Sequence, residues 1–194
     1  SDVCSSDLNS KDLCMIEHIP DMIDAGINSF KVEGRMKTAL YVAVVTRTYR
    51  EAIDDYYTSR ELYESKMEHY RQEIAACTFR QFTTGFYYGK PNEETQIYDC
   101  NTYVKNRVYL GMVEDVTEAG ELVLHQKNKF CVGDIVEVMA FDGENEDVEV
   151  LSIHDEHGTE MESAPHPKQL LYVKVSDSEK IRKGMIIRTR HCAA

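Results

Sequence analysis

The chain of 194 residues carries 34 acidic and 22 basic side chains, and its formal net charge of −12 argues against strong nucleic-acid binding by this stretch alone. Hydrophobic residues make up 42% of it, which is enough for a globular core, and no apolar run approaches the roughly 18 residues that a membrane helix needs. The first residues have neither the basic start nor the apolar run of a signal peptide, so we expect a cytoplasmic protein without a membrane partner.

The N-terminal part predicts helices. Residues 1–8 are polar and aperiodic, and we interpret them as an artefact or a tail. A helix start is predicted at residues 9–12, with Ser10 as a possible cap. Pro20 suits the first turn of a further helix, which Gly26 is expected to end.

The next stretch predicts the αβα order of a parallel α/β fold. An apolar strand is expected over 27–32, a turn at 33–35, and a long helix that Thr38 caps and that runs to about Ser59. A second amphipathic helix is expected over 60–77, followed by an aromatic connector at 79–98. One strand cannot make a sheet, so this unit requires strands from elsewhere.

Beyond a boundary near residue 92 the apolar period changes to two. Six strands are predicted, separated by glycine turns, over 103–114, 121–125, 135–140, 148–153, 169–174 and 185–190. Short strands at this spacing indicate a small closed β-barrel. We interpret the run from Asp142 to Glu162, with nine acidic residues and no lysine or arginine, as a solvated hairpin.

Three blocks carry a family resemblance. Residues 9–17 read NSKDLCMIE, residues 24–37 read DAGINSFKVEGRMK and residues 84–91 read TGFYYGKP. In this order they resemble the NSKDLC, EGRMK and TGFYFGKP stretches of the collagenase-like peptidase family U32, and above all its members that form 5-hydroxyuridine in tRNA. The resemblance extends over residues 9–190.

The resemblance implies an α+β chain in two parts. Residues 9–91 are expected to be the end of a (β/α) TIM-like catalytic barrel with a helical extension and the connector. Residues 92–194 are expected to be the family's small all-β barrel. The N-terminal half of the catalytic barrel is then a missing partner, and without it we expect the stretch to self-associate.

The resemblance also places a site at the end of the predicted strand, because the working face of such barrels lies at the C-terminal ends of the strands. Arg35 can hold a phosphate or carboxylate in a bidentate fork, and Glu33 can orient it or act as an acid or base. We therefore predict Glu33 and Arg35 as catalytic and Lys31, Arg35 and Lys37 as substrate-binding. The alternative is a salt bridge at the barrel rim.

Cys14, in the NSKDLC block, is the predicted metal ligand. The resemblance implies that it is one of four cysteines that hold an iron–sulfur (4Fe–4S) cluster in the full-length protein, and thiolates suit iron. A lone thiolate cannot hold four irons, so no cofactor is expected in this stretch alone. The alternative is a packed thiol.

Other candidates are weaker. His154 and His157 form H-x-x-H without the helix motif of zinc proteases. The aromatic residues Phe86, Tyr87 and Tyr88 can stack a base, although packing of the connector is the simpler interpretation.

Three functions stay open. The first is 5-hydroxylation of the tRNA wobble uridine, with tRNA as the partner. The second is a collagenase-like protease with a protein substrate, for which the sequence shows no nucleophile–base pair or metal motif. The third is a non-catalytic barrel that docks a substrate.

Overall fold

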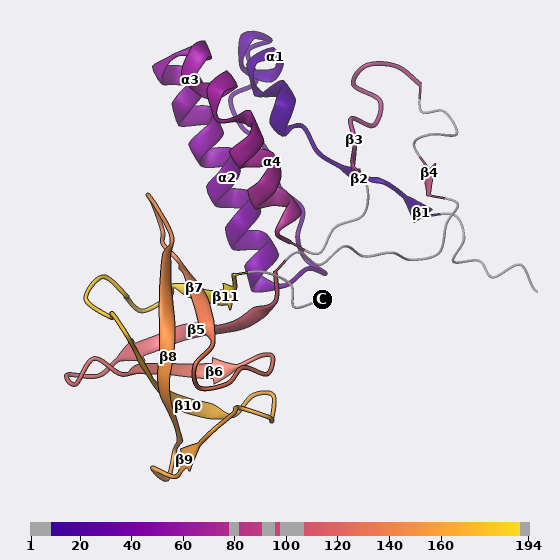
Figure 1. Ribbon diagram of the computed structural model, residues 1–194. Helices are drawn as coiled ribbons and strands as arrows, with labels where there is room; N and C mark the ends of the chain where they lie inside the picture. The colour runs from indigo at the N-terminus through magenta and orange to yellow at the C-terminus, as the bar shows by residue number, and fades with distance from the viewer. Residues whose placement is uncertain (1–8, 78–81, 91–95, 98–106, 191–194) are drawn as a thin grey trace, which may run out of the picture. The chain divides into compact units, whose positions relative to one another are not determined.

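The computed structural model describes residues 9–77, 82–90, 96–97 and 107–190 (Figure 1). Contacts divide the chain into two compact units, and the boundary in the sequence falls between Asn106 and Arg107. The predicted boundary near residue 92 and the predicted tail at 1–8 lie outside the described residues. Within the described part, no helix combines the length and apolar character needed to cross a membrane.

The first unit is helical. Its elements are η1 (Ile16–His18), α1 (Ile19–Asp24), α2 (Ala39–Thr58), α3 (Arg60–Ser65) and α4 (Met67–Ala75). Side-chain caps set the two internal starts: the Thr38 hydroxyl accepts from the Tyr41 amide at 3.2 Å, and the Ser59 hydroxyl accepts from the Leu62 amide at 3.0 Å. The predicted helix from Thr38 to about Ser59 is therefore confirmed.

The residues before α1 differ from the prediction. Residues 9–12 do not start a helix: β1 (Asn9–Ser10) pairs antiparallel with β4 (Gln96–Ile97), and β2 (Asp12–Leu13) pairs parallel with β3 (Phe82–Thr83). Backbone N–H and C=O groups that form hydrogen bonds to another strand cannot also form the hydrogen bonds of a helix. Strand pairing therefore prevents the helix start that Ser10 was predicted to cap. The next helix does follow the sequence, since Pro20 lies in the first turn of α1 and Gly26, at a φ of +81°, follows its end.

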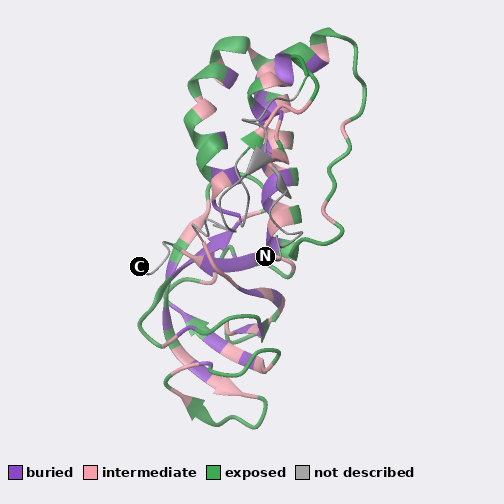
Figure 2. Cartoon of the chain, turned by 90° about the vertical axis from the view of Figure 1, so that its right-hand side faces the viewer, coloured by how far each residue is buried: buried purple, intermediate pink, exposed green. Residues whose placement is uncertain are grey.

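The predicted strand over 27–32 is absent. Residues 27–34 have no regular secondary structure and no strand pairing, and Ile27 and Val32 are exposed. Figure 2 shows the mostly exposed connection between α1 and α2. A strand exists only where a neighbour supplies its hydrogen bonds, and no described residue supplies one here. The αβα order is therefore wrong for this stretch.

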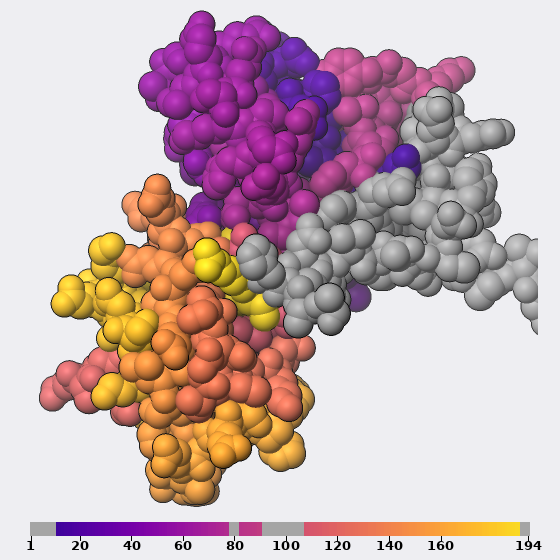
Figure 3. All heavy atoms as spheres, in the orientation of Figure 1, coloured from indigo at the N-terminus to yellow at the C-terminus, as the bar shows by residue number. Residues whose placement is uncertain are grey.

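The helices enclose one apolar core. Its buried members are Met15, Ile16, Ile19, Met22, Ala52, Tyr63, Tyr70 and Ile74. The predicted single helix over 60–77 breaks at Lys66 into α3 and α4, and Tyr63 rather than Leu62 is its buried residue there. In Figure 3 the purple atoms of the helical residues form one continuous surface on the face that is shown.

The second unit is the predicted β-barrel. Its strands are β5 (Tyr109–Val116), β6 (Leu122–Gln126), β7 (Ile135–Met139), β8 (Glu146–Asp155), β10 (Leu170–Val175) and β11 (Ile186–Thr189). They follow the order β10-β6-β5-β11-β7-β8, and β8 pairs back onto β10, so six antiparallel strands close. The short β9 (Glu160–Met161) extends β8. Helices followed by a small all-β barrel confirm the predicted α+β class.

The barrel wall contains a buried ion cluster. The carboxylate of Glu137 on β7 accepts hydrogen bonds from the guanidinium groups of Arg107 and Arg188 and from the Asn145 amide. Glu137 is 8% exposed and Arg188 is fully buried. Charges at this depth persist only when they are paired, so the cluster ties β7 to β11.

Candidate functional site

The predicted site residues meet at one cavity of the helical unit. This cavity, about 530 Å³ in volume and here called the Cys14 cavity, lies between the turn after β2, residues 27–37 and α2. Its wall includes Cys14, Lys31, Glu33 and Lys37, four of the five predicted site residues. Arg35 does not line it.

The turn that carries Cys14 is held by three hydrogen bonds. The Cys14 amide donates to the Thr83 carbonyl at 3.0 Å, which continues the pairing of β2 with β3. The Met15 amide donates to the Tyr49 hydroxyl at 2.8 Å, and the Tyr63 hydroxyl donates to the Ile16 carbonyl at 2.7 Å. These contacts fix the backbone on both sides of the thiol.

The sulfur of Cys14 lies in a partly buried, hydrogen-bonding environment. Its Sγ is 3.7 Å from the Tyr49 hydroxyl oxygen. Burial raises the pKa of the Cys14 thiol, and the nearby Ile16 backbone and Tyr49 hydroxyl oppose that rise. Burial likewise raises the pKa of Tyr49, so its hydroxyl keeps its proton at neutral pH.

The two lysines of the cavity differ in their surroundings. Lys37 Nζ lies 3.4 Å from Asp12 Oδ2 and 5.3 Å from the centre of the Tyr41 ring. Lys31 is exposed, and among the described residues no carboxylate lies within 4 Å of its ammonium group. Lys31 is thus the cation of this wall that remains available for an anionic ligand.

Glu33 and Arg35 form a turn and not a salt bridge. Glu33 Oε1 accepts from the Arg35 backbone amide at 2.9 Å. Arg35 is exposed, and within the described part of the chain no carboxylate lies within 4 Å of its guanidinium group. Gly34 permits the turn to approach α2, because a Cβ at this position would lie 3.0 Å from Val42 Cγ2.

The connector aromatics contribute one further residue to the site. Tyr87 lines the Cys14 cavity and is 58% exposed. Tyr88 turns the other way: its hydroxyl bonds to Asp21 and to His18 Nδ1, the latter at 2.9 Å. Packing of the connector therefore accounts for Tyr88, whereas Tyr87 presents its ring at the cavity.

The donor set fits one ligand of an iron–sulfur cluster. A thiol at the wall of a cavity, with the Tyr49 hydroxyl oxygen 3.7 Å from its sulfur, suits a thiolate ligand. Four thiolates are needed, and among the described residues no three His, Cys, Asp or Glu side chains form a metal site. The remaining ligands would have to come from other parts of the full-length protein.

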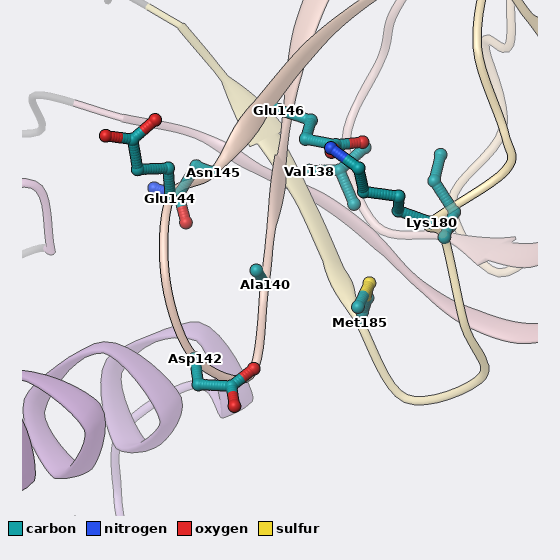
Figure 4. A pocket seen from close by; sticks show the side chains of 9 residues that line it. Val138, Ala140, Asp142, Glu144, Asn145, Glu146, Lys180 and Met185 are labelled. Carbon is teal, nitrogen blue, oxygen red and sulfur yellow. The ribbon is translucent and has the colours of Figure 1, made fainter.

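A second cavity, of about 510 Å³, lies in the barrel (Figure 4). Glu146 and Lys180 point toward one another across it, at 2.7 Å, and Asp142 lies at the tip of the hairpin between β7 and β8. No predicted site residue lies here. Its carboxylates belong to the acidic run that the sequence predicts to be solvated.

Family comparisons agree with this two-part architecture. Residues 4–97 match Peptidase family U32, and residues 105–188 match the Peptidase family U32 C-terminal domain. The chain belongs to peptidase family U32.

The similar curated proteins include tRNA hydroxylation proteins and collagenases. The chain is 37% identical to tRNA hydroxylation protein P1 of Bacillus subtilis, over 91% of this chain and 43% of the relative. It is 35% identical to a collagenase of Porphyromonas gingivalis, over 59% of this chain and 34% of the relative. A solved U32 C-terminal domain from Geobacillus thermoleovorans shares 30% identity, covers 42% of this chain and 99% of that domain, and has a TM-score of 0.39. The chain spans less than half the length of these curated relatives.

Tyr49 and Tyr87 are the site residues that sequence reasoning did not assign. Tyr49 belongs to an apolar helical stripe, where a tyrosine is usually a core residue. Tyr87 was one of three adjacent aromatics, and only the fold separates its orientation from that of Tyr88.

Proposed function

We propose that the full-length protein acts in 5-hydroxylation of the wobble uridine of tRNA, and that this stretch supplies a cluster ligand and part of the RNA-binding surface. The observation that carries the proposal is the meeting of Cys14, Lys31, Lys37 and Tyr87 at one cavity. The identity with a tRNA hydroxylation protein along 91% of the chain supports it.

The cavity residues have complementary parts in this proposal. Cys14 would hold the cluster, which supplies one-electron chemistry when it is bound. Lys31 and Lys37 attract the phosphates of an RNA strand, and the exposed ring of Tyr87 offers a base a stacking surface. Glu33 shapes the turn that presents Arg35 to solvent, where its fork can engage a further phosphate.

The charge distribution favours the helical unit as the RNA-contacting part. Residues 28–50 contain five basic side chains and one acidic side chain, a local net charge of +4. Residues 91–194 contain 11 basic and 20 acidic side chains, a net charge of −9. Phosphates are attracted by the former and repelled by the latter.

The proposal is tested in cells of the source organism from which the gene has been removed. We expect wobble 5-hydroxyuridine to disappear from tRNA digests analysed by mass spectrometry, and to return when the full-length protein is supplied. Unchanged 5-hydroxyuridine after removal of every gene copy that carries the NSKDLC and EGRMK blocks would exclude this role.

Peptidase activity is the second candidate, and the relation to a collagenase favours it. In the described part of the chain no group of metal ligands supports it. Degradation of gelatin by the purified full-length protein, abolished by a chelator or a protease inhibitor, would favour this candidate. If the barrel only docks a substrate, this stretch alone should catalyse neither reaction.

A further inference from the structure

The hydroxyl of Tyr49 is shared between two atoms of the Cys14 turn. Its oxygen accepts a hydrogen bond from the Met15 amide at 2.8 Å. The oxygen therefore presents a lone pair to Met15, and its own proton is directed elsewhere. The other polar atom at hand is Cys14 Sγ, at 3.7 Å, a separation that suits a hydrogen bond to the larger sulfur atom.

We propose that Tyr49 is a positioning residue for the Cys14 sulfur, which it holds in place and to which it donates a hydrogen bond when that sulfur is a thiolate ligand. This inference rests on the proposed function, because it takes Cys14 to be a cluster ligand.

The expected effect of such a donor is electronic. A hydrogen bond to a ligating sulfur withdraws electron density and favours the more negatively charged, reduced state. Tyr49 is suited to this role because it is half-buried on α2 and its hydroxyl oxygen lies 3.7 Å from the sulfur. Loss of its hydroxyl should make reduction of the bound cluster less favourable.

Tyr63 provides a control that distinguishes a hydrogen bond to the sulfur from mechanical support of the Cys14 turn. The Tyr63 hydroxyl donates to the Ile16 carbonyl at 2.7 Å, and Tyr63 is 2% exposed. It holds the same turn but makes no bond to the sulfur. Tyr63→Phe is therefore the matched control for Tyr49→Phe: each variant removes one tyrosine hydroxyl from the turn, and only one removes a donor to Sγ.

The test is a redox titration of the full-length protein, with iron per chain measured in parallel. We expect Tyr49→Phe to retain most of its iron and to lower the midpoint potential. A tenfold change in the reduction equilibrium, about 59 mV for a one-electron couple, is the expected size. Tyr63→Phe should leave the potential unchanged. A ring-fluorinated tyrosine at position 49, a stronger donor, should raise it even if Tyr49→Phe does not fold.

Two results would overturn the inference: an unchanged potential in both position-49 variants, or an equal shift in Tyr63→Phe. The proposed function fails in a different way. Full-length protein without iron, or Cys14→Ser protein with full iron, removes the ligand assignment itself. When Cys14→Ser loses iron and the position-49 variants show no shift, only the assignment of Tyr49 is wrong.

Discussion

Glu33 and Arg35 lie two positions apart and differ in their roles: Glu33 stabilises the turn, and Arg35 is exposed on it. The Glu33 carboxylate caps the backbone of the turn at the Arg35 amide, 2.9 Å away. The Arg35 guanidinium stays exposed and has no carboxylate partner within 4 Å among the described residues. An exposed, unpaired guanidinium held on a fixed turn is suited to binding an anion of the substrate.

Replacing Arg35 by lysine should impair the reaction and leave the fold intact. Lysine keeps the positive charge but loses the planar fork, and a lost charge-assisted contact costs about 1.5–3 kcal/mol, roughly ten- to a hundredfold in binding. We expect a fall of that order in tRNA modification by the full-length protein. Arg60→Lys is the control and should leave modification unchanged, because Arg60 is an exposed α3 residue outside the basic stretch and pairs with Glu64. Equal activity in wild type and Arg35→Lys would assign Arg35 to the surface.

The sequence predicted the site only where local motifs mark it. Cys14, Lys31, Glu33 and Lys37 belong to the two family blocks, and the fold brings all four to one cavity. Tyr49 lies 35 residues after Cys14, and their contact depends on how α2 packs against the turn. No local pattern encodes a packing contact of that kind, so the sequence could not assign Tyr49.

At the level of elements, the cap at Thr38 and the stop at Gly26 were predicted correctly, whereas the helix start at residues 9–12 and the strand at 27–32 were not. The start of α2 follows from the Thr38 cap and the end of α1 from Gly26, because capping involves residues within one turn. The strand expected at 27–32 needs a neighbouring strand, which no described residue provides. In the barrel each strand finds its partners within the same unit, and the six predicted strands form there.

The stability of the barrel should depend strongly on the Glu137 carboxylate. Glu137→Ala should destabilise the chain by about 3–5 kcal/mol, because it removes the carboxylate that accepts hydrogen bonds from the buried Arg188 and from Arg107. Urea unfolding followed by circular dichroism measures the loss.

The matched control for Glu137→Ala is Glu149→Ala on β8. Glu149 is exposed, so its replacement should change the free energy of unfolding by less than about 0.5 kcal/mol. A loss at Glu137 as small as the one at Glu149 would show that the ion cluster does not stabilise the barrel.

At the level of the whole molecule, the chemistry is unevenly distributed. The Cys14 cavity is built entirely from the helical unit, and the barrel contains none of the predicted site residues. The chain spans 43% of its Bacillus subtilis relative. In the proposed function, this stretch contributes one thiolate ligand and part of a basic surface, and the reaction belongs to the full-length protein.

The most direct test of this account is the iron content of full-length protein that carries Cys14→Ser, measured together with the 5-hydroxyuridine of its tRNA. Serine keeps the shape of the side chain but offers iron a harder, weaker ligand. The account predicts that the variant loses most of its iron and its modification product, whereas Cys131→Ser, a change at a half-buried thiol of the barrel, keeps both. Full iron and normal tRNA modification in Cys14→Ser would contradict the account and leave Cys14 as a packed thiol.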